Sequence, residues 1–171
     1  MTDLTGLYLN YWLLYAGPEN YLCADGIRDF SAMEVQWSGA PGMKRGDRAL
    51  LYRKSMKKFT LQELSVMSDL SLERAMELKR HDVGSDIADL WEIVAGDQGP
   101  MPGWNVSCLI RHVACIRPPL RLTELKSKRE LLKWKDLRWN FQAQGRDALE
   151  IPEFAWVLIK QMINERLSHP L

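Results

Sequence analysis

The hydrophobic and polar positions of the first third of the chain predict strands separated by turns. Residues 7–15 form a short, aromatic and apolar run that ends at AGPEN, whose composition is typical of a turn. Residues 43–47, MKRGD, form a second tight turn, and residues 48–54, RALLYRK, are expected to be a strand with basic residues at both ends. The segment 31–36 fits either a short helix or a strand.

Helical spacing follows, and then two long apolar runs. Thr60 and Glu63 form a capping box ahead of apolar positions, so we expect a helical insertion over 59–81. Residues 85–95 and 105–116 are strand candidates, joined by a loop rich in glycine and proline. Because they are neighbours along the chain, we expect these two strands to pair as a hairpin.

The C-terminal third is predicted to be mainly helical. Pro118 and Pro119 are expected to end the second long strand, and the basic segment 122–137 is expected to be a helix. Pro152 opens a last helix at its first turn. The apolar face expected of that helix consists of Phe154, Leu158, Ile159, Met162 and Ile163. This order of elements is mixed α+β and fits a small curved sheet or barrel with helices at its rim.

Length and composition are those of an ordinary folded protein. The 171 residues fit a single domain, 1–171, of which 46% are apolar and 26% charged. The net charge of +1 provides no global attraction to nucleic acid or to a membrane, so any electrostatic footprint must be local. The N-terminus lacks a signal-peptide pattern, and no uncharged apolar stretch reaches about 18 residues, so we expect a cytoplasmic protein with no membrane association.

The sequence predicts no cofactor, metal site or catalytic residue. Cys23, Cys108 and Cys115 are an odd set without CxxC spacing, which argues against a disulfide framework and a structural zinc site. There is no Ser/His/Asp arrangement, P-loop or dinucleotide-binding glycine pattern. His112 falls in the middle of a predicted strand, and we expect a hydrogen-bonded sheet residue there rather than a catalyst.

Cationic residues gather in two places. One group brackets the strand at 48–54, and the other lies in the helical region after residue 116. Each group alone is typical of a solvated face, but clustering in a nearly neutral chain permits one positive face for phosphates. The candidate phosphate contacts of the first group are Lys44, Arg45, Arg53 and Lys54.

The seven tryptophans are an unusual feature of the composition. Trp12, Trp91 and Trp156 lie within apolar strand or helix patterns and are expected in the core. Trp134 and Trp139 flank charged residues, and we expect one of them to pack and the other to be half exposed.

Trp37 and Trp104 differ from these because both adjoin loops of glycine and proline that precede strands. Two indoles at loop–strand junctions can form the facing walls of a slot for one planar heterocycle, with each stacked face contributing roughly 1–3 kcal/mol. The alternative is that they are plugs that close a small barrel. If Trp37 lines a slot, Trp37→Ala should abolish binding with little loss of folding.

A series of segments, in this order along the chain, resembles EVE domains. It comprises YWLLYAGPENY, WSGAP with MKRGDRALLYRK, SDIADLWEIVA, WNVSCLIRHVACIRPPLRLTELK and QGRDALEIPEFAWVLIK. The last segment also resembles the related YTH domains, and both families are PUA-like. The insertion at 59–81 lies outside the resemblance, and SGAP after Trp37 is closer to the YTH form than to the usual EVE form.

The resemblance implies a small curved β-barrel of about five or six strands with flanking helices. It also implies recognition of a modified base in DNA or RNA, flipped into an aromatic pocket or cage. By position, Trp37 and Trp104 correspond to pocket walls, and Ser38 to a residue that presents its backbone or hydroxyl to the base edge. Tyr15 corresponds to the point where the first strand leaves toward the pocket. The closing Arg146 and Asp147 correspond to contacts with a phosphate and a base edge.

The leading interpretation is therefore nonenzymatic binding of a modified nucleobase. One alternative is an enzyme acting on nucleosides or nucleic acid, with Tyr15, Lys54 and Asp147 as candidates. Another is a protein-interaction domain in which the tryptophan slot is buried or holds a peptide. The sequence leaves open which base is bound, whether the polymer is DNA or RNA, and whether a nuclease or modification system is a partner.

Overall fold

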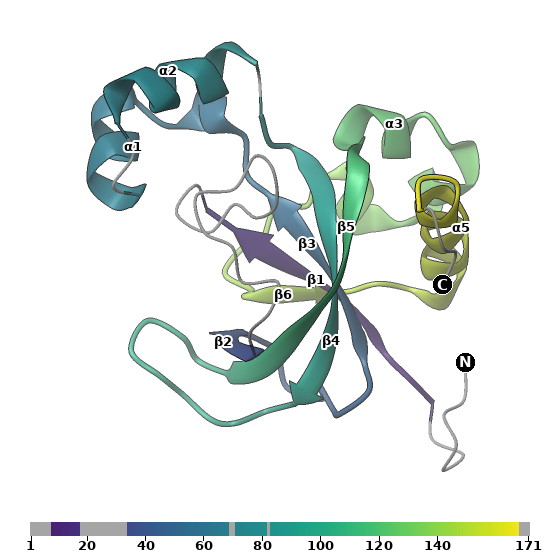
Figure 1. The fold of residues 1–171 in the computed structure, drawn as a ribbon. Coiled ribbons are helices and arrows are strands. Elements are labelled where there is room, and N and C mark those ends of the chain that lie inside the picture. Colours follow the sequence, from purple (N-terminus) through teal and green to yellow (C-terminus); the bar gives the residue numbers. More distant parts are fainter. Residues whose placement is uncertain (1–7, 18–33, 69–70, 82, 168–171) are drawn as a thin grey trace.

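A single six-stranded sheet forms the centre of the protein, with the strand order β2-β5-β4-β3-β1-β6. The computed structural model describes residues 8–17, 34–68, 71–81 and 83–167 (Figure 1). The strands are β1 (Tyr11–Ala16), β2 (Glu34–Ser38), β3 (Arg48–Arg53), β4 (Asp86–Ala95), β5 (Ser107–Arg121) and β6 (Ala148–Glu150). Their pairing is antiparallel except between β1 and β3, and β4 and β5 form the predicted hairpin.

The sheet curls into a half-barrel, and its strands carry apolar side chains on both faces. Along β1, Trp12 and Leu14 belong to the inner cluster, whereas Tyr11 and Leu13 belong to the outer one. Trp37, on the edge strand β2, also belongs to the inner cluster, so this edge folds over β1. The inner core is therefore closed by the sheet itself.

Helices cover the outer face of the sheet. Three short segments follow β5, and a longer helix follows β6: α3 (Leu122–Lys126), η4 (Arg129–Lys133), α4 (Lys135–Arg138) and α5 (Glu153–Asn164). Figure 1 shows α3 and α5 on the same side of the sheet. Trp156 of α5 stacks on Tyr11 of β1, with ring centroids 4.4 Å apart and planes inclined by 9°. The expected core positions of Trp12, Trp91 and Trp156 are confirmed.

The predicted helical insertion is present between β3 and β4. It consists of η3 (Met56–Lys58), α1 (Leu61–Ser68) and α2 (Leu72–Arg80), which project to one side of the sheet (Figure 1). The Thr60 hydroxyl accepts the backbone N–H of Glu63 at 3.0 Å, as the capping box predicts. The insertion has its own small apolar cluster, formed by Met56, Leu64, Ala75 and Leu78.

Three expectations about element boundaries are wrong. Strand β5 continues through Pro118 and Pro119 to Arg121, because both prolines lie where the β4–β5 register shifts and ladder hydrogen bonds are not needed. The segment 122–137 is broken into short helical pieces rather than one helix. Phe154 is exposed, and the buried face of α5 instead contains Ala155, Trp156, Ile159, Met162 and Ile163.

Trp37 lies on a strand rather than in a glycine-rich loop. The segment 31–36, for which helix and strand were both open, contributes its last residues to β2. None of the described helices is long and apolar enough to span a bilayer.

Candidate functional site

The residues singled out in the sequence divide between the two ends of the half-barrel. Strand β3 runs from one end at Arg48 to the other at Arg53, a rise of about 17 Å. The end reached at Arg53 is called here the Tyr15 end, and it gathers Tyr15, Lys54, Arg146 and Asp147, with the indole N–H of Trp37 reaching the Tyr15 carbonyl from within the core. The opposite end is called the Asp47 end, and it gathers Ser38, Lys44, Arg45 and Trp104.

Backbone pairing brings the members of the Tyr15 end together. The β1–β6 register pairs Leu14 with Ala148, so the residues that follow and precede them, Tyr15 and Asp147, are neighbours. The indole N–H of Trp37 donates to the carbonyl of Tyr15 at 3.1 Å. On the other side of β1, the backbone N–H of Lys54 donates to the carbonyl of Ala16 at 3.1 Å. Segments of β1, β2, β3 and β6 therefore meet at the end of β1 through their backbones and the indole N–H of Trp37, while the Tyr15 and Trp37 side chains pack on the outer and inner faces of the sheet, respectively.

The phenol of Tyr15 is a hydrogen-bond donor at this end. Its hydroxyl donates to the backbone carbonyl of Phe141 at 2.7 Å. Burial is the main reason that the pKa of Tyr15 is raised above its ordinary value, while nearby Arg146 lowers it and Asp136 raises it. The phenol therefore stays neutral at physiological pH, which makes it unsuited to act as a base or a nucleophile.

Trp37 is a core residue of the inner cluster. It is 6% exposed, and its ring centroid lies 6.3 Å from that of Trp91 with the planes inclined by 31°. Its packing partners are thus in this chain, in agreement with the alternative in which Trp37 plugs the barrel. Its indole N–H connects it to the Tyr15 end through the backbone carbonyl of Tyr15.

Arg53 is not available to a phosphate in this structure. Its side chain is 1% exposed, and its Nε and Nη2 atoms donate to the two carboxylate oxygens of Asp86 at 2.7 and 2.8 Å. A buried bidentate pair of this kind joins β3 to β4. By contrast, Lys54 is exposed, and Arg146 is exposed while pairing with Asp136 at 2.8 Å.

The Asp47 end holds the other candidates. Ser38 pairs with Ser107 in the β2–β5 ladder, and the next residue, Gly39, donates its backbone N–H to the carbonyl of Val106 at 2.9 Å. Trp104 is half-buried in a turn closed by reciprocal backbone hydrogen bonds with Met101. Among the described residues, Trp104 is neither part of the inner cluster that contains Trp37 nor packed against it, so these contacts do not make the two indoles facing walls of one slot.

A buried carboxylate organises the Asp47 end. Asp47 accepts hydrogen bonds from the indole N–H of Trp12, from the backbone N–H groups of Asn10 and Lys44, and from the Lys44 ammonium at 2.7 Å. Lys44 is thus engaged within the protein, whereas Arg45 is exposed. Sequence analysis did not single out Asp47, although its place in the MKRGD turn before β3 is a usable signal.

His112 is a hydrogen-bonded sheet residue, as expected. Its Nε2 atom lies 2.9 Å from Oδ1 of buried Asp89, and its ring meets Trp91 edge-on. The Sγ atom of Cys115 lies near this pair, but Cys115 is disulfide-bonded and cannot supply a thiolate ligand. We therefore assign no metal site here. The expectation against a disulfide framework does not hold for Cys115, whereas Cys108 is a free, buried thiol.

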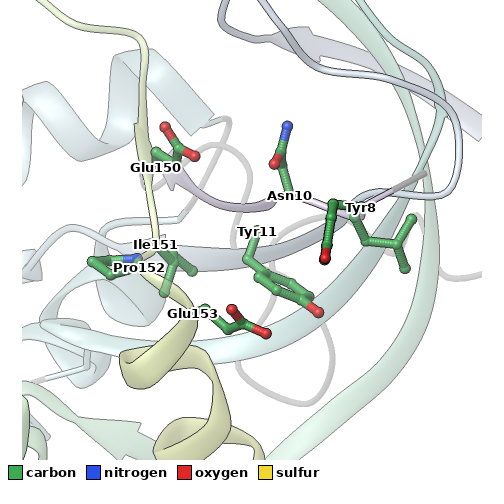
Figure 2. A pocket seen from close by; sticks show the side chains of 8 residues that line it. Tyr8, Asn10, Tyr11, Glu150, Ile151, Pro152 and Glu153 are labelled. Atoms are coloured by element: carbon green, nitrogen blue, oxygen red, sulfur yellow. The ribbon is translucent and has the colours of Figure 1, made fainter. Parts of the chain in front are cut away.

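A pocket that sequence analysis missed lies between the start of β1 and the β6–α5 connection. It has a volume of about 220 Å³, and Figure 2 shows Tyr11 and Glu153 beside it with Glu150 on the β6 side. A second, shallow depression of about 470 Å³ continues along α5 beside Trp156 and Lys160. None of the residues predicted to bind a base or a phosphate lines either hollow.

Comparison with known proteins identifies the fold. No family model matches the sequence, and no curated protein matches it significantly. The solution structure of Rpa0253 from Rhodopseudomonas palustris is 18% identical, with 94% of this chain and 97% of that one covered at a TM-score of 0.58. The crystal structure of Atu2648 from Agrobacterium tumefaciens is 16% identical, with the same coverage and a TM-score of 0.59.

Two human structures also match. The THYN1 protein in complex with DNA containing 5-methylcytosine is 15% identical, with 90% of this chain and 97% of that one covered at a TM-score of 0.51. The DUF55 domain of thymocyte nuclear protein 1 is 16% identical, with 90% and 98% covered at a TM-score of 0.52. At these identities the likeness shows the fold alone, and the chain has an α+β half-barrel fold that matches these solved structures.

Proposed function

We propose that this protein binds nucleic acid carrying a modified base, without catalysis, and that the base is taken up at the Tyr15 end. The observation that supports this most is that the segments carrying Tyr15, Lys54, Arg146 and Asp147 meet at the end of β1, where the buried Trp37 holds the Tyr15 carbonyl. The structural likeness to a human protein bound to methylated DNA supports nucleic acid as the ligand class.

Each member of this group has a physical role in the proposal. Trp37 fixes the Tyr15 carbonyl from within the core, so the rim of the site is held by buried structure. The half-buried carboxylate of Asp147 can accept a hydrogen bond from an exocyclic amino group of a base. The exposed cations Lys54 and Arg146 can neutralise flanking phosphates, which offsets the few kcal/mol that flipping a base costs.

Binding is favoured over catalysis by the state of Tyr15. The enzymatic alternative needs an activated group, and the raised pKa of Tyr15 together with its hydrogen bond to Phe141 removes the phenol from that role. Lys54 and Asp147 remain as polar contacts in the proposal, where neither has to transfer a proton.

A binding screen tests the proposal. Single strands of about twelve nucleotides, in DNA and RNA forms and with one central base either modified or unmodified, are titrated while tryptophan fluorescence is followed. 5-Methylcytosine is the first base of the series because of the human complex. Burial of one methyl group alone provides about a fourfold preference. We expect at least one modified base to exceed that, namely one whose modification itself offers a hydrogen bond that the unmodified base lacks.

Two matched charge reversals locate the site. Lys54→Glu, at the Tyr15 end, should weaken binding and reduce its salt dependence, whereas Arg45→Glu, at the Asp47 end, should change both much less. Both residues are exposed, so neither substitution disturbs the core. The proposal fails if no modified strand binds more tightly than its unmodified counterpart, or if Arg45→Glu is the more damaging variant.

A further inference from the structure

The segment 126–146 carries a local excess of positive charge. It contains seven cationic side chains and two carboxylates. Both carboxylates are already engaged by cations of the same segment, Glu130 by Lys133 at 2.7 Å and Asp136 by Arg146 at 2.8 Å. Since the whole chain has a net charge of +1, this excess is a property of one surface rather than of the protein as a whole.

Four exposed cations of this segment form no ion pair with any carboxylate of the described residues. They are Lys128, Arg129, Lys135 and Arg138. Clustered cations that are not neutralised by carboxylates attract polyanions, because each phosphate they neutralise releases condensed counterions from the nucleic acid. Charge of this kind supplies affinity and strong salt dependence, but it carries no information about the bases.

An exposed indole lies within this surface. Trp139 is 49% exposed, and the ammonium of Lys135 lies over its ring, 5.3 Å from the centroid. The expectation that one of Trp134 and Trp139 packs and the other is half exposed is thereby confirmed, with Trp134 as the buried member and Trp139 as the exposed one. An aromatic platform among cations is the composition with which proteins hold single-stranded nucleic acid.

The backbone fixes the position of this indole. The N–H of Trp139 donates to the Lys135 carbonyl at 3.1 Å, and the next two residues, Asn140 and Phe141, adopt positive φ values of 57° and 56°. Phe141 is buried against Trp134, with ring centroids 5.0 Å apart. Asparagine adopts this conformation readily, but a bulky residue such as Phe141 does so only where surrounding contacts hold it there. Trp139 is therefore presented by a rigid support.

The same support adjoins the Tyr15 end. The carbonyl of Phe141 accepts a hydrogen bond from the hydroxyl of Tyr15. Arg146, the last residue of the segment, lies two residues before the start of β6. On the basis of the proposed function, we propose that the segment 126–146 binds the single-stranded nucleic acid where it leaves the Tyr15 end. We call this surface the track. An unpaired neighbouring nucleotide stacks its base on Trp139, and its flanking phosphates lie against Lys128 and Arg129.

The test compares a strand with a single nucleotide. Fluorescence anisotropy is measured for a labelled single strand of about twelve nucleotides carrying one 5-methylcytosine, in DNA and RNA forms, and the mononucleotide of 5-methyldeoxycytidine is titrated separately. Trp139→Ala should weaken binding of the strand by about 5- to 150-fold and leave binding of the mononucleotide unchanged. Trp139→Phe should restore most of the affinity, because it keeps an aromatic face.

Charge is tested with a matched pair of arginines. Arg129→Glu should weaken strand binding and flatten its salt dependence, whereas Arg80→Glu, an equal change of charge on an exposed residue of α2, should do neither. If polyglutamate of similar charge competes as well as the strand, the surface is a general anion binder and the proposal is overturned. Unchanged strand affinity in Trp139→Ala also overturns it.

These outcomes separate this inference from the proposed function. If wild-type protein binds the mononucleotide and the strand equally well, the track is refuted and the base site stands. If wild-type protein binds neither form of the strand nor the mononucleotide, both proposals fall together. If Trp139→Ala lowers the affinity for the RNA strand but not for the DNA strand, or the reverse, the result supports the track and identifies the polymer.

Discussion

The indole N–H of Trp37 donates to the backbone carbonyl of Tyr15 at 3.1 Å, and this contact joins the edge strand β2 to β1 across the inner core. It explains how one tryptophan can be both a core residue and part of a candidate site. The ring fills the half-barrel, while its polar edge fixes the point where β1 ends. A substitution at Trp37 therefore changes folding and the site together.

We expect Trp37→Ala to destabilise the protein by about 3–5 kcal/mol, because it removes a buried indole and leaves a cavity beside Trp91. Trp37→Phe should cost less, since it keeps most of the apolar volume and loses only the donor to Tyr15. Urea unfolding followed by circular dichroism measures both. The sequence-based expectation of little loss of folding would regain support if Trp37→Ala were as stable as the wild-type protein.

The Arg53–Asp86 pair gives a second prediction. Arg53→Met should cost about 3–5 kcal/mol, because it leaves the buried Asp86 carboxylate without its partner. The double variant Arg53→Met with Asp86→Leu should recover most of that loss, as both charges are then gone. Urea unfolding at low and high salt provides the measurement. A single variant that costs less than about 1 kcal/mol would mean that the pair behaves as a solvated surface pair.

Most of the fold could be predicted from the sequence because local patterns and the tertiary structure agree. The capping box at Thr60 and the apolar runs at 85–95 and 105–116 each specify an element by short-range rules. Pro118 and Pro119 were misjudged because their effect depends on the register with β4, which no local pattern contains. Phe154 was misjudged because helical spacing defines the centre of the buried face only to within one or two residues.

The candidate site was harder to predict for the same reason. Its members lie far apart in sequence, and their convergence depends on the pairing of β1 with β6 and on the closure of β2 over β1. The composition around Trp37 resembled a loop, although strand pairing with Cys108 fixes its direction toward the core. The burial of Arg53 could not be predicted from the sequence either, because only the β3–β4 ladder brings its partner Asp86 opposite it.

Asp47 gives a third prediction, at the end opposite the candidate site. Asp47→Ala should cost about 3 kcal/mol or more, because it leaves the buried indole N–H of Trp12 and the partly buried backbone N–H of Asn10 without an acceptor. Lys44→Met is the matched control, and it should cost less than about 1 kcal/mol because it removes only a partly exposed ion pair. Thermal melts of the two variants distinguish these cases. Equal losses would show that the ion pair, rather than the buried network, is what Asp47 contributes.

The last prediction concerns alkaline pH. Burial raises the pKa of the Cys108 thiol to about 12, and burial also raises the pKa values of Tyr15 and Tyr52. In an unfolded chain, a cysteine ionises near pH about 8.5 and a tyrosine near pH about 10. Above pH about 9 the unfolded chain therefore binds fewer protons than the folded one, so the free energy of unfolding must fall as pH rises, by up to about 1.4 kcal/mol per pH unit for each such group.

Urea unfolding at intervals between pH about 8 and about 10 tests this dependence, and Cys108→Ala isolates the thiol because the tyrosines in the unfolded chain are still largely protonated over most of that range. The variant should be less stable than the wild type near pH 8 by the small cost of a buried sulfur atom, and its stability should fall less steeply as the pH rises. The two stabilities should thus approach each other toward pH about 10. Parallel curves would show that the Cys108 thiol ionises as readily in the folded protein as in the unfolded chain, which its burial in the inner core opposes.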